Sequence, residues 1–222
     1  MERKVAVGVI TLSAIVLLTG VSFAGYGKKN EQKAEEPAAA PAVADDSQAA
    51  APDAAQQEMM AKMTEYMTPN ENHRVLDALI GDWTYTSKHW MSPAAPAEET
   101  TGTASSKWIM DGRFVEQSVQ GTMMEKPFNG TSLIGYDNAG KEYQSVWYDN
   151  MGTGMMVTKG SYDAANKTLT TSGNFNCPLR GNMAVRWVTK IIDANSYSFE
   201  MWGPDEAGTD FKGMEIIYTK KQ

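Results

Sequence analysis

The sequence predicts a mainly β protein, with one antiparallel up-and-down β-barrel of about ten strands preceded by two short α-helices. Three observations carry this prediction. Apolar residues recur at helical spacing only at the start of the domain. After Gly81, runs rich in Val, Ile, Thr, Tyr and Trp alternate with short turns containing Gly, Asn or Asp. A meander of this many strands removes its exposed edges by closing on itself.

The two predicted helices precede the barrel. The first spans residues 57–67, where methionines recur every four residues and form an apolar face, and it ends at Pro69. The second spans residues 71–80 and ends at Gly81, which favours a helix C-terminus.

Tight turns such as "DNAG", "AAN" and "DAN" separate the predicted strands and imply that strands adjacent in sequence pair antiparallel. The predicted strands are 82–90, 99–109, 112–123, 129–137, 142–149, 154–162, 167–175, 183–192, 196–202 and 211–220.

Alternation along the strands predicts which side chains point into the barrel. The predicted inward faces mix polar and apolar residues, as a ligand cavity requires. We predict that the ligand-binding residues are His89, Arg113, Gln117, Tyr143, Trp147, Asp149 and Trp187. An inward Arg113 would need a carboxylate partner or an anionic ligand; the alternative is an arginine at a strand start that reaches solvent. In the last strand the inward face is either Phe211, Glu215 and Ile217, or Met214, Ile216 and Tyr218.

The N-terminus has the layout of a secretory signal peptide, residues 1–24. Arg3 and Lys4 precede an apolar run from Val5 to Leu18, and Ser22 and Ala24 supply the small residues of a cleavage site. The run is shorter than the ~18 residues of a membrane-spanning helix, so we expect no stable membrane span after cleavage; an uncleaved anchor is the alternative. The expected location is periplasmic or secreted.

Residues 25–57 are rich in Ala, Pro, Glu, Asp and Gln and predict a disordered linker. The folded domain is then 58–222, with 15 of the 20 basic and 20 of the 27 acidic residues, a formal charge of −5. Nucleic-acid binding is therefore not expected, because phosphate recognition needs clustered Lys and Arg. The single cysteine, Cys177, excludes an internal disulfide and is interpreted as a loop or half-buried thiol.

Neither a metal site nor a cofactor is predicted. The two histidines, His73 and His89, have no metal-ligand spacing between them or with Cys177. His89 as an axial haem ligand is an alternative to a strand or surface histidine. Methionine clusters can bind Cu(I), but Met59 and Met63 at helical spacing are also an ordinary apolar helix face.

Catalytic motifs are not evident. The chain has no G-x-S-x-G elbow and no glycine-rich phosphate loop that opens a helix. Only the carboxylates of Asp149, Glu200 and Glu215 motivate an enzyme, so no catalytic residue is predicted.

Five segments together resemble a bacterial family named domain of unknown function 1579: "HRVLDALIGDWTY", "WMSPAAP", "GTASSKWIMDGRFVEQSVQG", "PFNGTSLIGYDNAGKEYQSVWYDNMGTG" and "FEMW" followed by "MEIIYTKK". The resemblance covers residues 68–220. Met110-Asp111 departs from the family, which commonly has a small residue before Gly-Arg-Phe.

The resemblance implies a lipocalin-like or calycin-like β-barrel and no established activity. Gly81 and Trp83 look like the lipocalin G-x-W element, in which the Trp closes one end of the barrel. They are therefore interpreted as structural, and a late basic residue, Lys220 or Arg186, is expected to pack over the Trp.

The function favoured by these patterns is an exported protein that holds a small, partly apolar ligand in a barrel cavity. The alternatives are an envelope interaction module with a filled core and, ranked lower, a haem- or metal-binding barrel or a carboxylate-based enzyme. A cavity well above one water in volume would speak against the filled core.

Overall fold

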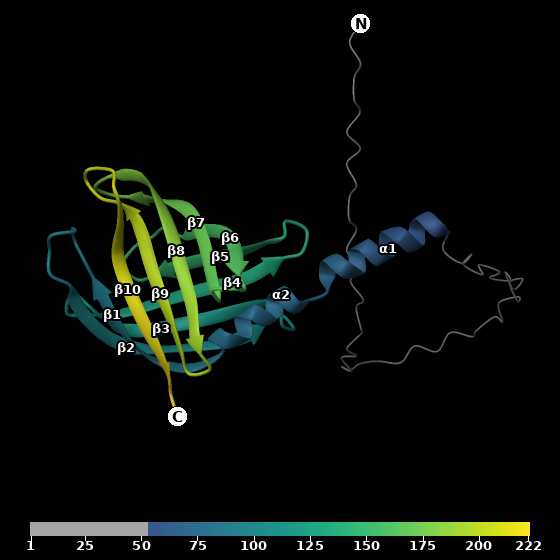
Figure 1. Ribbon diagram of the computed structural model, residues 1–222, viewed down its shortest axis with the longest axis horizontal. Helices are drawn as coiled ribbons and strands as arrows, with labels where there is room; N and C mark the ends of the chain where they lie inside the picture. The colour runs from purple at the N-terminus through teal and green to yellow at the C-terminus, as the bar shows by residue number, and fades with distance from the viewer. Residues whose placement is uncertain (1–52) are drawn as a thin grey trace, which may run out of the picture. The chain divides into compact units, whose positions relative to one another are not determined.

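The computed structural model describes residues 53–222 (Figure 1). The predicted signal peptide and residues 25–52 of the predicted linker lie outside the described residues. The first elements are α1 (Ala54–Met67), α2 (Glu71–Arg74) and the 3₁₀ helix η1 (Val75–Leu79). The strands are β1 (Gly81–His89), β2 (Glu98–Ile109), β3 (Phe114–Met123), β4 (Lys126–Asp137), β5 (Glu142–Asp149), β6 (Met156–Asp163), β7 (Thr168–Cys177), β8 (Gly181–Asp193), β9 (Ser196–Pro204) and β10 (Asp210–Lys220).

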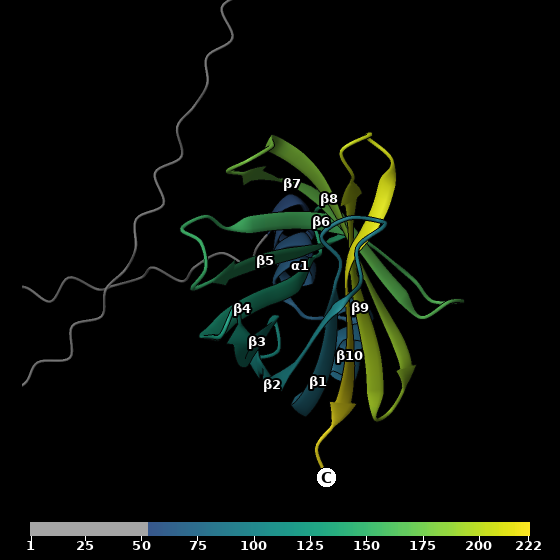
Figure 2. The ribbon, with the colours of Figure 1, turned by 90° about the vertical axis from the view of Figure 1, so that its left-hand side faces the viewer.

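The ten strands form one closed antiparallel barrel, which confirms the predicted mainly β meander. Each strand pairs with its neighbours in sequence, and β1 closes the ring against β10, from Trp83 opposite Lys220 to His89 opposite Met214. Figure 2 shows the strands following one another around the barrel. Every strand therefore has two partners, and the barrel presents no free edge for pairing with another chain.

Helix α1 begins earlier than predicted, because Asp53 caps it. The Asp53 carboxylate accepts from the Gln56 amide nitrogen at 2.8 Å, and the Gln56 side chain accepts from the Asp53 nitrogen at 3.0 Å. This reciprocal pair satisfies two donors that a helix start leaves free. Residues 54–56, assigned to the linker alone from the sequence, are thus helical.

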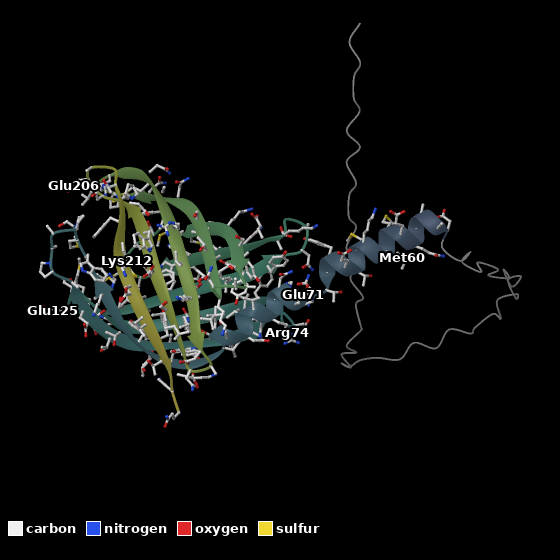
Figure 3. All side chains as sticks on the ribbon, in the orientation of Figure 1. Met60, Glu71, Arg74, Glu125, Glu206 and Lys212 are labelled. Atoms are coloured by element: carbon white, nitrogen blue, oxygen red, sulfur yellow. The ribbon has the colours of Figure 1, made fainter. Side chains whose placement is uncertain are left out.

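The methionine face of α1 is not buried against any part of residues 53–222, unlike an ordinary apolar helix face. No α1 residue is buried, and Met59, Met60 and Met63 are all exposed. The helix contacts the barrel only at its C-terminal end, where Asn138 Nδ2 donates to the carbonyls of Glu65 and Thr68. Figure 1 shows α1 extending away from the barrel beyond α2, and Figure 3 marks Met60 on it.

The second predicted helix is one α-helical turn that tightens into η1. Asn70 caps its start by accepting from the Asn72 nitrogen at 2.9 Å. The Asn70 nitrogen in turn donates to Nδ1 of His73 at 3.1 Å, so the buried imidazole completes the cap. Helix η1 then brings Leu76 and Leu79 against the barrel interior at one end.

Trp83 closes this end of the barrel. Its side chain is fully buried, and Nε1 donates to the Leu79 carbonyl at 3.0 Å. Tyr197 meets the indole edge-on at a centroid distance of 4.8 Å, and Lys220 Nζ lies 5.4 Å from the ring centroid. Gly81 has φ +129°, and a Cβ there would lie 3.0 Å from Cε of Lys220. Glycine at position 81 thus permits both the backbone turn and the close approach of the lysine.

The pairing that closes the barrel also determines which face of β10 points inward. Inward-facing Tyr85, Ser87 and His89 of β1 lie opposite Tyr218, Ile216 and Met214. Residues directly opposite in an antiparallel pair share a face, so the Met214, Ile216 and Tyr218 face points inward.

We expect Trp83→Ala to lower the free energy of unfolding by about 3–5 kcal/mol, because it removes a buried indole and leaves a cavity that η1 cannot fill. Urea unfolding measured by circular dichroism tests this. Trp202→Ala is the matched control on the outer face, where the ring is only half-buried, and should destabilise less. Equal losses for the two variants would contradict the assigned role of Trp83.

Candidate ligand-binding cavity

The barrel encloses a cavity of about 230 Å³. Leu79 lies at its closed end, while Met123, Asp149 and Met151 line it at the opposite end, where Met151 is itself exposed. In Figure 3, Glu125 and Glu206 mark the loops of this open end, and Glu71 and Arg74 mark the end beside α2. The lining is mostly apolar, with several small hydroxyl side chains.

Five of the seven predicted ligand-binding residues line this cavity: His89, Gln117, Trp147, Asp149 and Trp187. They come from four strands, β1, β3, β5 and β8. The structure places the other two, Arg113 and Tyr143, elsewhere.

Arg113 does not share the inward face of Val115. It lies in the turn before β3, after Met110, Asp111 and Gly112, all of which have positive φ. Its guanidinium donates to the Met67 carbonyl at 2.8 Å and to the Met110 carbonyl at 3.2 Å. The arginine therefore holds the end of α1 on the outside of the barrel rather than an anion within it.

Tyr143 points inward but lies in the core at the closed end. It is 2% exposed, and its hydroxyl donates to the Asn72 carbonyl at 2.8 Å. Burial raises the pKa of Tyr143, as do the neighbouring rings of Tyr136 and Tyr162. The phenol therefore stays neutral and fastens α2 to the barrel.

Gln117 is fixed by two partners within the cavity wall. Its Nε2 donates to Ser106 Oγ at 3.0 Å and to the Tyr197 hydroxyl at 2.7 Å. Burial raises the pKa of Tyr197, and the hydrogen bond from Gln117 opposes that rise. Both amide hydrogens of Gln117 are thus used, and only its oxygen remains to accept from a ligand.

Asp149 orients Trp147, and both of its carboxylate oxygens accept hydrogen bonds from the protein. Its Oδ2 accepts from Trp147 Nε1 at 2.8 Å, and its Oδ1 accepts from the Met151 nitrogen at 2.9 Å. The Trp147 ring lies over Gly130, where a Cβ would be 2.3 Å from the indole. Phe128 stacks with the Trp147 ring at a centroid distance of 6.3 Å.

His89 lies on the inner face near the open end. Burial lowers its pKa, and the charge of Glu98 opposes this effect. Its Nε2 lies 2.9 Å from Oγ of the buried Ser87. The imidazole is therefore neutral near pH 7 and can serve as a hydrogen-bond partner.

Methionines make up much of the open half of the cavity wall. The sequence analysis did not predict any methionine as a ligand-binding residue. The lining contains Met123, Met151, Met156, Met201 and Met214. Of these, Met214 lies directly between His89 and Met201 in the strand register. Alternate side chains of β9 and β10 point inward, so Met201 and Met214 can be identified as lining residues once the strand register is known.

Trp187 combines burial with an unpaired donor. Its side chain is 7% exposed, and its Nε1 is the one buried side-chain nitrogen or oxygen without a hydrogen-bond partner in the part of the chain that the structure describes. Phe199 meets the ring edge-on at a centroid distance of 6.0 Å.

The three carboxylates that motivated an enzyme do not share a site. Asp149 lines the cavity, whereas Glu200 and Glu215 lie on the outer face and both bind Lys212 Nζ. A shared acid–base centre of these groups is therefore absent. Arg186 also points outward, where it pairs with Asp210 and stacks over Trp202.

Among the described residues 53–222, no group of three His, Cys, Asp or Glu side chains is arranged to hold a metal ion. Cys177 ends β7 as a half-buried free thiol. Within the same residues, no helix has the length and apolarity to cross a membrane.

The family model for a protein of unknown function, DUF1579, matches residues 68–220. The chain belongs to the DUF1579 family. The match begins directly after α1 and ends with β10, so it comprises α2, η1 and all ten strands.

The likeness of this DUF1579 barrel to a crystal structure of 12% identity concerns the fold alone. The crystal structure of Rv2717c from M. tuberculosis is similar with a TM-score of 0.51 and 12% identity over 70% of this chain and 100% of that chain. A redesigned β-barrel, b11L5F_LGL, has a TM-score of 0.35 and 14% identity over 67% of this chain and 96% of its own. No curated protein matches the chain.

Because His73 is buried and His89 is half-buried, we expect the free energy of unfolding to depend on pH. Burial lowers the pKa of both His73 and His89 below the ordinary value of 6.5. As pH falls below 6.5, the unfolded chain takes up protons that the folded chain does not, so we expect the free energy of unfolding to decrease. Urea unfolding between about pH 7.5 and pH 5, where histidine titrates, measures this.

The variant His89→Gln separates the two histidines. It removes one titrating group, and we expect a shallower decline of stability in this pH range. The pKa values of Asp163 and Asp193 are lowered from 3.8 by hydrogen bonds, so their contribution is lost only at lower pH. An unchanged slope for His89→Gln would contradict the role given to His89.

Proposed function

We propose that this protein binds a small, mostly apolar molecule inside its barrel. The observation that carries the proposal is the cavity of about 230 Å³ that reaches the open end. A single water occupies roughly 10–15 Å³ in the same sense of volume, and an apolar cavity of roughly 150 Å³ takes up benzene. The space therefore suits a molecule somewhat larger than benzene, and its volume argues against the filled-core alternative.

The chemistry of the wall supports an apolar ligand. Within residues 53–222, no lysine or arginine lines the cavity, and the one carboxylate in the lining, Asp149, already accepts from Trp147 and Met151. Burial of apolar ligand surface contributes roughly 25 cal/mol per Å². Flexible methionines near the mouth adapt to ligands of different shape.

The entrance is also apolar. Met91, Met124, Met155 and Leu179 lie in four different loops or turns of the open end, and each is exposed. Exposed apolar side chains around a cavity mouth are typical of an interaction site. They offer an apolar molecule a first contact before it enters the barrel.

The closed end supports a lipocalin-like interpretation in one respect. Gly81, Trp83 and Lys220 have the arrangement that the resemblance implies, with the lysine over the indole. The number of strands differs, because this barrel has ten and lipocalins have eight. We therefore limit the lipocalin-like proposal to the closed end.

We also infer that the protein is exported, to the periplasm or out of the cell. The basic pair Arg3-Lys4, the apolar run and the small residues at Ser22 and Ala24 support this.

Ligand binding predicts a change in tryptophan fluorescence, because Trp147 and Trp187 line the cavity. We expect naphthalene and N-phenyl-1-naphthylamine to quench or shift the emission in a saturable titration. Ser132→Leu places a larger side chain on the lining and should weaken binding at least several-fold at unchanged fold. The matched control is Thr131→Leu, the neighbouring residue on the opposite face, which should bind as the parent does.

Two results would overturn the proposal. One is the absence of any saturable response to these probes in the folded protein. The other is equal weakening by Ser132→Leu and Thr131→Leu, which would place the probes on the outer surface.

Export predicts a processed N-terminus. Protein from the envelope fraction of the expressing cells should begin at Gly25, and intact-mass measurement identifies this directly. A protein that retains residues 1–24 would instead support the uncleaved anchor.

A further inference from the structure

Trp187 supplies a donor that the barrel itself does not satisfy. The side chain is 7% exposed, and Nε1 has less than 1 Å² of accessible surface and no partner among the described residues. Burying such a donor costs roughly 1–3 kcal/mol. The surrounding side chains cover this nitrogen, so an acceptor reaches it only when one of them moves.

The neighbouring side chains place Trp187 in the wall of the proposed binding site. In the strand register Trp187 lies opposite Thr171 on one side and Met201 on the other, and all three line the cavity. Thr158 Oγ1 donates to Thr171 Oγ1 at 2.8 Å. Thr171 thus keeps its own hydroxyl hydrogen for another acceptor.

The N–H of the other indole in the cavity, that of Trp147, already has a hydrogen-bond acceptor. Trp147 donates to Asp149, and both amide hydrogens of Gln117 have partners. The hydroxyl groups of the lining rotate and can donate or accept, whereas an indole N–H has one fixed direction and only donates. Of the two indoles in the cavity, Trp187 is therefore the one whose N–H has no acceptor within the protein.

The charges of the cavity wall restrict the kind of acceptor atom that a ligand can place beside Trp187. No cationic side chain lines the wall, and Asp149 contributes a negative charge near the mouth. A buried ligand carboxylate would lack a counter-ion, which is strongly unfavourable. A neutral carbonyl oxygen accepts an N–H hydrogen bond without this penalty.

We propose that Trp187 is the specificity-determining residue of the cavity and that it selects a neutral, mostly apolar molecule carrying a carbonyl group, whose oxygen accepts from Trp187 Nε1. This inference rests on the proposed binding function. Met201 lies beside Trp187 in the register, and its unbranched side chain moves aside to admit the oxygen.

The test compares two probes of the same shape. Acetophenone carries a carbonyl where α-methylstyrene carries a methylene group. Dissociation constants of both are measured by equilibrium dialysis for the full-length parent protein and for Trp187→Phe, which keeps an aromatic ring and removes the donor. We expect the ratio of the two affinities to shift by about fivefold toward α-methylstyrene in Trp187→Phe.

The matched control is Trp147→Phe. It removes an indole from the same cavity, but that indole donates to Asp149, so the affinity ratio should equal that of the parent. A second measurement is direct: in the parent, the indole N–H proton signal missing from spectra of Trp187→Phe should move downfield on addition of acetophenone and not of α-methylstyrene.

The outcomes separate this inference from the proposed function. Binding of both probes to the parent with an unchanged ratio in Trp187→Phe overturns the role of Trp187 and leaves the binding function intact. Binding of neither probe to the parent overturns both. Circular dichroism and urea unfolding confirm that the variants are folded, and Trp187→Phe should be at least as stable as the parent because the unpaired donor is gone.

Discussion

The pairing of β1 with β10 is the constraint on which the other features depend. It joins the two ends of the meander, from Trp83 opposite Lys220 to His89 opposite Met214. At one end it brings the lysine over the indole that closes the barrel. At the other it sets His89 beside the methionines of the mouth. Because side chains alternate along a strand, this single register also determines which face of β10 points inward.

The two ends of the barrel differ in how their polar groups are satisfied. At the closed end His73, Tyr143 and Trp83 are buried, and each has a backbone partner supplied by α2, η1 or the residue that caps them. The bonds of Trp83 and Tyr143 hold the short helices against the strands. Toward the open end the wall consists of methionines, aromatic rings and small hydroxyls. The closed end thus stabilises the barrel, and the open end carries the mouth of the cavity for which we propose a ligand.

Within the cavity, hydrogen bonding distinguishes groups that shape the wall from the one left for a partner. Gln117 is held by Ser106 and Tyr197, and Trp147 is held by Asp149. These bonds fix the side chains before any ligand arrives, which reduces the entropy lost on binding. Trp187 carries the same kind of donor without an internal acceptor. The contrast between the two indoles, rather than the cavity volume, points to the chemistry of the ligand.

The sequence by itself determined the antiparallel meander, nearly all strand positions and five of the residues that line the cavity, because turn residues and two-residue alternation are local properties. The tertiary structure decided what depends on distant partners. Arg113 has the parity of an inward residue but lies in a turn and binds α1. Tyr143 does point inward, but only the position of α2 places it in the core. Met201, Met214 and the unpaired nitrogen of Trp187 became recognisable only when barrel closure fixed which strands, and therefore which side chains, lie side by side.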